Sequence, residues 1–321
     1  ELYPGILSDE DRMLPFSLSK IHHGTGARFI IIIDEWDAMF REDKDDEAAQ
    51  QAYIELLRGL FKGEQSKDFV KLAYITGILP IKKYKSESAL NNFDEFTMTN
   101  PGRLAEYVGF TEQEVKNLCK TYHMDFSEAA RWYDGYSFRR MKHVYNPNSV
   151  VKAMMDGAYD NYWTSTVTYE SLKGYISLNF DDLRASVVWM LAGGRCQGNT
   201  DTFSNDMTSF KGRDDVLTIL IHLGYLAYDR DAKEVYIPNE EVRAAFANVV
   251  KETDWTPVIQ AMEQSEALLK ATWKKDADAV ARGIGQVHMA NASILKYNDE
   301  NSLSCVITLA YYNAVNEYTL I

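Results

Sequence analysis

The stretch from Arg28 to Phe40 constrains this chain most, because it joins a short apolar strand directly to a group of acids. It reads Arg-Phe-Ile-Ile-Ile-Ile-Asp-Glu-Trp-Asp-Ala-Met-Phe. The five apolar residues Phe29 to Ile33, four of them β-branched, predict a strand buried on both faces, as in the centre of a parallel sheet. Asp34 and Glu35 follow at the carboxyl end of this strand, where open α/β sheets place their ligand crevices.

A second predicted strand strengthens this interpretation. Apolar residues over Gln51–Phe61 have helical spacing, and Val70–Thr76 then reads as another buried strand. A helix between two such strands predicts a right-handed parallel crossover, with Thr76 beside Asp34 at one edge of the sheet.

This arrangement is typical of P-loop NTPases. There, an acid in the position of Asp34 holds Mg²⁺, and in many of them the next acid, here Glu35, orients the attacking water. In ATPases of this plan a polar residue in the position of Thr76 senses the γ-phosphate. The simpler alternatives stay open: an acidic, solvated turn after a strand, and a threonine that closes a strand before Gly77.

The phosphate-binding loop of such enzymes is missing from this sequence. No Gly-x-x-x-x-Gly-Lys-Ser/Thr occurs anywhere in it. Gly24-Thr25-Gly26 is too short and lacks the lysine, so we interpret it as a helix-to-strand turn. The chain starts at Glu1 without a methionine and stops at Ile321 inside an apolar element, so we expect a fragment at both ends.

Composition narrows the class of protein. With 321 residues, 46% of them apolar, the chain is expected to fold into two or three domains rather than to be disordered. A net charge of −13 argues against a general nucleic-acid surface. No apolar run approaches the ~20 residues of a membrane helix and no signal peptide is visible, so we expect no membrane contact and a cytoplasmic location.

The rest of the chain predicts mainly helices. Thr111 and Glu114 form a capping box at the start of a helix that runs to about Tyr122. Residues 214–250 predict a helix, a hairpin and a second helix, which is the order of a winged-helix module. The aromatic stretches at 132–136 and 145–150 suit stacking on a base, or, more commonly, packing against a helical layer.

Several motifs together resemble a known family, the bacterial AAA-ATPase-like proteins with a C-terminal PD-(D/E)XK nuclease-like domain. The matching stretches run through nearly the whole chain: Ile-Ile-Ile-Asp-Glu-Trp-Asp at 31–37, Tyr-Ile-Thr-Gly-Ile-Leu-Pro-Ile at 74–81, Ser-Ala-Leu-Asn-Asn-Phe at 88–93, Gly-Phe-Thr-Glu-Gln-Glu-Val at 109–115, Trp-Tyr-Asp-Gly-Tyr at 132–136, Tyr-Asn-Pro-Asn-Ser-Val at 145–150, Asp-Asp-Val-Leu-Thr at 214–218, Ile-His-Leu-Gly-Tyr-Leu at 221–226 and Tyr-Asn-Asp-Glu at 297–300.

The resemblance implies roles for individual residues. Asp34 is the Mg²⁺ acid, Glu35 the water-orienting acid and Thr76 a candidate γ-phosphate sensor. Asp37 positions the loop by hydrogen bonds at the nucleotide site. Glu300 is a supporting carboxylate in the first helix of the nuclease-like domain. Family members carry a phosphate loop before the position of Glu1 and a Glu-x-Lys metal strand after that of Ile321.

We therefore expect an α/β part with a partial P-loop NTPase-type parallel sheet, followed by a mostly helical part with a winged-helix-like module and the start of a nuclease-like domain. The expected domains are 1–105, 106–212, 213–252 and 253–321. The expected cofactors are ATP and Mg²⁺, bound poorly or not at all by this stretch alone. Three functions stay open: an ATPase, an ATPase coupled to a nuclease that contacts nucleic acid, and a degenerate scaffold that binds a protein partner without catalysis.

Overall fold

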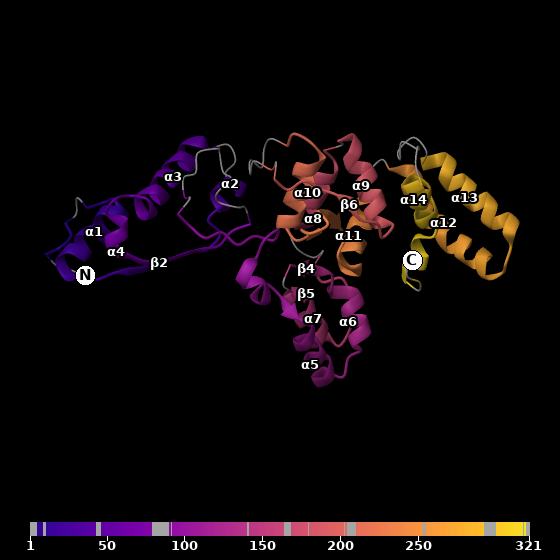
Figure 1. The fold of residues 1–321 in the computed structure, drawn as a ribbon, viewed down its shortest axis with the longest axis horizontal. Coiled ribbons are helices and arrows are strands. Elements are labelled where there is room, and N and C mark those ends of the chain that lie inside the picture. The colour runs from indigo at the N-terminus through magenta and orange to yellow at the C-terminus, as the bar shows by residue number, and fades with distance from the viewer. Residues whose placement is uncertain are drawn as a thin grey trace. The chain divides into compact units, whose positions relative to one another are not determined.

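A computed structural model gives the fold (Figure 1). It describes residues 5–8, 11–42, 46–78, 90, 92–139, 141–163, 168–178, 180–201, 203, 210–252, 255–291, 300–316 and 318. These residues form mostly helices, with three small sheets. They fall into two compact units, residues 1–97 with 203–210 and residues 98–202 with 211–321. Nothing in this division tests the four predicted domains, which stay a prediction.

The first unit contains a two-stranded parallel sheet. Strand β1 (Phe29–Ile33) pairs with β2 (Val70–Ile75), and their last residues, Ile33 and Ile75, are partners in the register. The parallel pairing of the two predicted strands is thus confirmed. The helices of this unit are α1 (Leu14–Thr25), α2 (Ala38–Glu42), α3 (Glu47–Phe61) and α4 (Ser66–Phe69).

Local sequence signals explain where these helices begin and end. Helix α1 stops at Thr25, and Gly26 adopts a left-handed φ of 73° before the strand, which confirms the predicted helix-to-strand turn. Helix α3 begins four residues earlier than predicted, because the Asp46 carboxylate accepts a hydrogen bond from the Ala49 amide, 2.9 Å away.

The prediction that the first strand is buried on both faces was wrong. Exposure alternates along β1: its odd-numbered residues are half-buried, whereas Ile30 and Ile32 are 58% and 70% exposed. Their register partners Leu72 and Tyr74 in β2 are 56% and 53% exposed. Four apolar side chains therefore form an open face of the sheet. An unbroken apolar run predicts what a strand can bury, not whether a second layer of structure covers it.

The second unit begins with a 3₁₀ helix, η2 (Gly102–Tyr107), and a small antiparallel sheet in the order β3-β5-β4. Its elements are β3 (Phe110–Thr111), α5 (Glu112–Tyr122), α6 (Phe126–Tyr133), β4 (Tyr136–Phe138), β5 (Met141–Tyr145) and α7 (Pro147–Asp156). The capping box is confirmed: the Glu114 amide donates to Thr111 Oγ1 at 3.3 Å, and the Thr111 amide donates to Glu114 Oε2 at 2.8 Å.

A predicted helix, hairpin and helix follow. They are α10 (Arg213–His222), the antiparallel strands β7 (Ala227–Asp229) and β8 (Glu234–Tyr236), and α11 (Glu240–Lys251). They are preceded by α8 (Thr168–Ile176), α9 (Asp181–Leu191) and β6 (Cys196–Gln197), and β6 adds a third strand to the hairpin on the β8 side. The order of elements is as predicted, while the assignment of these elements to a winged-helix module stays a prediction.

The aromatic motifs lie in the interior of this unit. Tyr133 and Tyr145 are 0% and 1% exposed. The Tyr136 hydroxyl donates to the Gly224 carbonyl at 2.6 Å, and the Tyr236 hydroxyl donates to the Gly135 carbonyl at 3.0 Å. Buried tyrosines with satisfied hydroxyls are packing elements, which matches the commoner of the two uses expected for these stretches.

Three helices and a 3₁₀ turn complete the described chain: α12 (Thr256–Trp273), α13 (Ala277–Asn291), α14 (Glu300–Ala310) and η3 (Tyr312–Asn316). Residues 274–276 form the short turn between α12 and α13. Glu300 begins α14, and residues 297–299 of its motif lie outside the described residues. Among the described helices, none combines the length and apolarity that crossing a bilayer requires.

Candidate functional site

Asp34 and Thr76 meet where the two parallel strands end. The Thr76 amide donates to the Ile33 carbonyl at 2.9 Å, which continues the sheet by one residue. The Thr76 hydroxyl donates a hydrogen bond to Asp34 Oδ1. The contact follows from the register, because the residues after two paired strand ends in a parallel sheet emerge at the same edge.

Glu35 turns the chain sharply away from the strand. Its φ of 50° lies in the left-handed region, which costs a non-glycine residue about 1–2 kcal/mol. The Glu35 amide then points at both neighbours, 3.1 Å from Asp34 Oδ1 and 3.2 Å from Thr76 Oγ1. Strained backbone that is held by specific hydrogen bonds is a recurrent feature of functional sites.

One oxygen of Asp34 remains available for a ligand. Oδ1 receives the bonds from Thr76 and from the Glu35 amide, whereas Oδ2 has no hydrogen-bond partner among the described residues. The Asp34 side chain is exposed. In the part of the chain that the structure describes, no group of three or more acids, histidines or cysteines could hold a metal. The donor set fits Mg²⁺, which is often bound through one or two carboxylates, with water and substrate phosphates completing the shell.

Asp37 lies under the turn rather than at its surface. It is 0% exposed, and its Oδ2 accepts a hydrogen bond from the Ile78 amide at 3.1 Å. The bond ties the segment after β1 to the segment after β2. Gly77 is required at this point, because a Cβ there would lie 2.4 Å from Trp36 Cδ1 and 2.8 Å from Asp37 Oδ1. A cation could therefore reach Asp34 but not Asp37.

Arg41 is a residue of this site that sequence reasoning missed. Its Nη2 lies 2.9 Å from Glu35 Oε2, and its Nε lies 3.4 Å from Asp37 Oδ2. One guanidinium thus joins the exposed acid of the turn to the buried one. Arg41 lies within helix α2. The spacing of four residues from Asp37 was the signal that could have identified it.

An aromatic layer supports the turn from inside. The Trp36 and Phe40 rings lie 5.5 Å apart, and the Phe40 and Tyr53 rings 6.1 Å apart. Trp36 is held further by its amide, which donates to the Thr76 carbonyl at 2.8 Å. Burial, and secondly the charge of Asp37, raise the pKa of the Tyr53 phenol, so Tyr53 is neutral in this layer. The turn that carries Asp34 and Glu35 is therefore supported by packed aromatic side chains.

The structure brings together all four residues predicted for the nucleotide site, Asp34, Glu35, Thr76 and Asp37, at one end of one small sheet. Glu300, predicted for the nuclease-like domain, belongs to the other unit. In comparisons with known proteins, no family model, no curated protein and no solved structure matches this chain.

Proposed function

We propose that the edge formed by Asp34, Glu35 and Thr76 is the metal and water half of a nucleoside triphosphate hydrolysis site. The observation that supports this most is the hydrogen bond from Thr76 to Asp34 across two paired strand ends. It joins an acid suited to Mg²⁺ and a polar residue suited to a γ-phosphate at the edge where α/β sheets bind ligands.

Each residue has a distinct task in this proposal. Asp34 Oδ2 is the protein ligand of Mg²⁺, which supplies neutralising charge for the β- and γ-phosphates when it is bound. Glu35, whose side chain is 64% exposed, aligns a water molecule for attack on the γ-phosphate. Thr76 holds Asp34 in place and is the candidate contact to the γ-phosphate. Asp37, buried beneath the turn, ties the segment after β1 to the segment after β2 through its hydrogen bond from the Ile78 amide.

Residues 1–321 contain no phosphate-binding loop with its lysine. We therefore expect residues 1–321 alone to bind Mg²⁺–ATP poorly or not at all. The proposal concerns the protein as its gene encodes it, with the missing loop supplied outside this sequence. A cytoplasmic location belongs to the same proposal.

Isothermal titration of the gene-encoded protein with Mg²⁺–ATP tests this directly. We expect saturable binding that Asp34→Asn weakens at least tenfold, because the amide cannot replace a carboxylate on the metal. Asp68→Asn, which removes an exposed acid of the same unit at α4, is the matched control and should leave the affinity unchanged. Absence of binding by the unaltered protein, or equal binding by both variants, would remove the ATPase proposal.

The family resemblance extends the proposal to a C-terminal metal-dependent nuclease that contacts nucleic acid. In that case ATP turnover regulates the nuclease. The described residues of α12 to α14 supply the helices before its metal site, with Glu300 at the start of α14. A Glu-x-Lys strand in the gene after Ile321 is expected, and a stop codon there would remove this extension.

A second candidate function is a protein-binding scaffold without catalysis. The open apolar face formed by Ile30, Ile32, Leu72 and Tyr74 favours it, because parallel sheets are normally covered on both faces. If a bound protein covers the face, Ile32→Lys should abolish association with that protein and leave Mg²⁺–ATP binding unchanged. A gene without any phosphate-loop lysine would favour this candidate over the first.

A further inference from the structure

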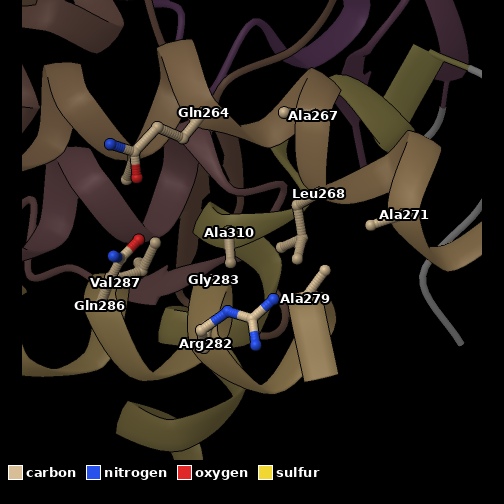
Figure 2. A pocket seen from close by; sticks show the side chains of 11 residues that line it. Gln264, Ala267, Leu268, Ala271, Ala279, Arg282, Gly283, Gln286, Val287 and Ala310 are labelled. Atoms are coloured by element: carbon tan, nitrogen blue, oxygen red, sulfur yellow. The ribbon is translucent and has the colours of Figure 1, made fainter. Parts of the chain in front are cut away.

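Arginine side chains in this protein differ in how firmly the fold holds them. Arg282 is exposed at the rim of a groove of ≈260 Å³ between α12 and α13, which Figure 2 shows with its lining residues. Arg41 in the first unit is instead held by two carboxylates: its Nη2 lies 2.9 Å from Glu35 Oε2, and its Nε lies 3.4 Å from Asp37 Oδ2. The Arg41 side chain is only 20% exposed. Arg41 therefore has a defined position beside the acids of the turn.

The anchor of Arg41 is a buried acid. Asp37 is 0% exposed, and its Oδ2 also accepts the hydrogen bond from the Ile78 amide. Helix α2 sets the spacing: the Arg41 amide donates to the Asp37 carbonyl at 3.1 Å, and residues four apart on a helix lie on the same face. The guanidinium is thus tied to a carboxylate that is itself fixed by the segment after β2.

Glu35 depends on this guanidinium for the orientation of its side chain. The Glu35 side chain is 64% exposed, and its ion pair with Arg41 is the one contact of its carboxylate among the described residues. An exposed glutamate without such a partner samples several rotamers, and fixing one of them has an entropic cost. Because Arg41 engages Oε2, Oε1 is left to bond a water molecule.

We propose that Arg41 is the positioning residue of this site: it fixes Glu35 through Oε2, so that Oε1 aligns the attacking water. This inference rests on the proposed function and adds the residue that orients the water-aligning acid. A guanidinium suits the task because its rigid plane of N–H donors bonds two carboxylates at once, whereas an ammonium is a single point charge on a flexible stem. Orientation matters because a misplacement of about 1 Å costs about 100-fold in rate.

Isothermal titration and turnover of the gene-encoded protein with Mg²⁺–ATP test the proposal. Arg41→Gln should lower turnover at least about tenfold and leave the dissociation constant within about twofold, because Arg41 acts on Glu35 and not on the nucleotide. Glu35→Gln/Arg41→Gln should turn over at most about twofold more slowly than Glu35→Gln alone, since no carboxylate remains to be positioned. Lys67→Gln removes an exposed cation of α4, at the other end of β2. It is the matched control and should change neither quantity.

A measurement without nucleotide tests the contact itself. In thermal unfolding of residues 1–321, the separate midpoint shifts of Glu35→Gln and Arg41→Gln should together exceed the shift of the double variant by about 1 °C or more, because both remove the same ion pair. Arg41→Lys serves if Arg41→Gln does not fold, since it keeps a positive charge beside Asp37 without the planar fork. It should lower turnover at least about threefold with an unchanged dissociation constant.

The outcomes separate this inference from the proposed function. Absence of Mg²⁺–ATP binding by the unaltered protein would remove the proposed function and this inference with it. Binding and turnover that Arg41→Gln or Arg41→Lys leaves unchanged would overturn this inference alone. A tenfold loss of affinity in Arg41→Gln would make Arg41 a ligand of the nucleotide and also overturn it. Additive losses of turnover, or additive thermal shifts, in Glu35→Gln/Arg41→Gln would do the same.

Discussion

Ser149 Oγ lies 2.9 and 2.8 Å from the two carboxylate oxygens of Glu241, 92 residues away, in the interior of the second unit. Glu241 is 0% exposed and also accepts hydrogen bonds from the Tyr162 and Trp163 amides at 2.8 and 3.0 Å. Burial raises the pKa of this carboxyl, against the lowering effect of its hydrogen bonds. One buried acid thus fastens the loop before α8 to α7 and α11.

Glu241→Ala should lower the free energy of unfolding by about 3–5 kcal/mol, because the buried Ser149 hydroxyl and two part-buried amides lose their acceptor and a cavity remains. Glu241→Gln keeps one acceptor oxygen and should cost less. Glu263→Ala, at an exposed position of α12, is the control and should change stability by less than about 0.5 kcal/mol. Urea unfolding measures all three, and equal stability of Glu241→Ala and the unaltered chain would contradict the role assigned to this acid.

Gly135 should not tolerate a side chain. Its φ is 120°, and a Cβ there would lie 1.9 Å from the Pro238 carbonyl oxygen. We expect Gly135→Ala to destabilise the protein by more than about 3 kcal/mol, from steric overlap combined with backbone strain. Gly157 also has a positive φ, 66°, but nothing lies within 4 Å of its Cβ position. Gly157→Ala should therefore cost only about 1 kcal/mol. Thermal unfolding of both variants measures the two costs: Gly157→Ala reports backbone strain alone, and the additional loss in Gly135→Ala reports steric overlap. Equal losses in the two variants would contradict this assignment.

His143 and Asp134 form a pH-dependent contact. His143 Nδ1 lies 2.6 Å from Asp134 Oδ2, and this bond, together with the charge of Asp134, raises the pKa of the imidazole. A raised folded-state pKa stabilises the fold below the unfolded pKa of about 6.5, and that stability is lost as pH rises through the folded pKa. His143→Gln should therefore be less stable than the unaltered chain at pH 5.5 and nearly equal at pH 9.

The size of this effect should stay below about 1 kcal/mol, because the imidazole is 58% exposed and solvent screens the pair. Thermal unfolding at several pH values measures it. The backbone gives a second readout: His143 has a φ of 60°, so His143→Gly relieves strain that His143→Ala retains. We expect the glycine variant to be the more stable of the two by about 1 kcal/mol. If the difference in stability between His143→Gln and the unaltered chain did not change with pH, protonation of His143 would not contribute to stability, and the prediction would be wrong.

The two acids that Arg41 joins should respond differently to substitution. Asp37 is completely buried, whereas the Glu35 side chain is 64% exposed. Asp37→Ala should lower the free energy of unfolding by about 2–4 kcal/mol, because the part-buried Ile78 amide and the Arg41 guanidinium lose a partner. Glu35→Ala should change it by less than about 1 kcal/mol. Urea unfolding of the two variants compares them, and the reverse order would contradict the placement of Asp37 beneath the turn.

Sequence reasoning succeeded where local pattern determines structure. The end of β1 and the end of β2 could be located from apolar runs, and parallel pairing then brings Thr76 beside Asp34. Similarly, a capping box depends only on Thr111 and the residue three positions later. Such features need no knowledge of what lies elsewhere in the chain.

The same reasoning failed where distant residues decide. The exposure of Ile32 depends on whether a second layer covers the sheet, which the strand's own sequence does not encode. The stretch Tyr-Asn-Pro-Asn-Ser-Val at 145–150 holds several residues that could cap a helix, and Asn146 is the one that caps α7. The helix begins at Pro147, and Ser149 is directed to Glu241 instead. Periodicity gave no indication of that pairing across 92 residues.

The most direct test of the central claim is ATP turnover by the gene-encoded protein carrying Glu35→Gln. If Asp34 and Glu35 form the metal and water half of a hydrolysis site, the variant should bind Mg²⁺–ATP with unchanged affinity. Turnover should fall at least about 100-fold, because the water loses the group that orients it. Unchanged turnover in Glu35→Gln, with Mg²⁺–ATP still bound, would contradict the account.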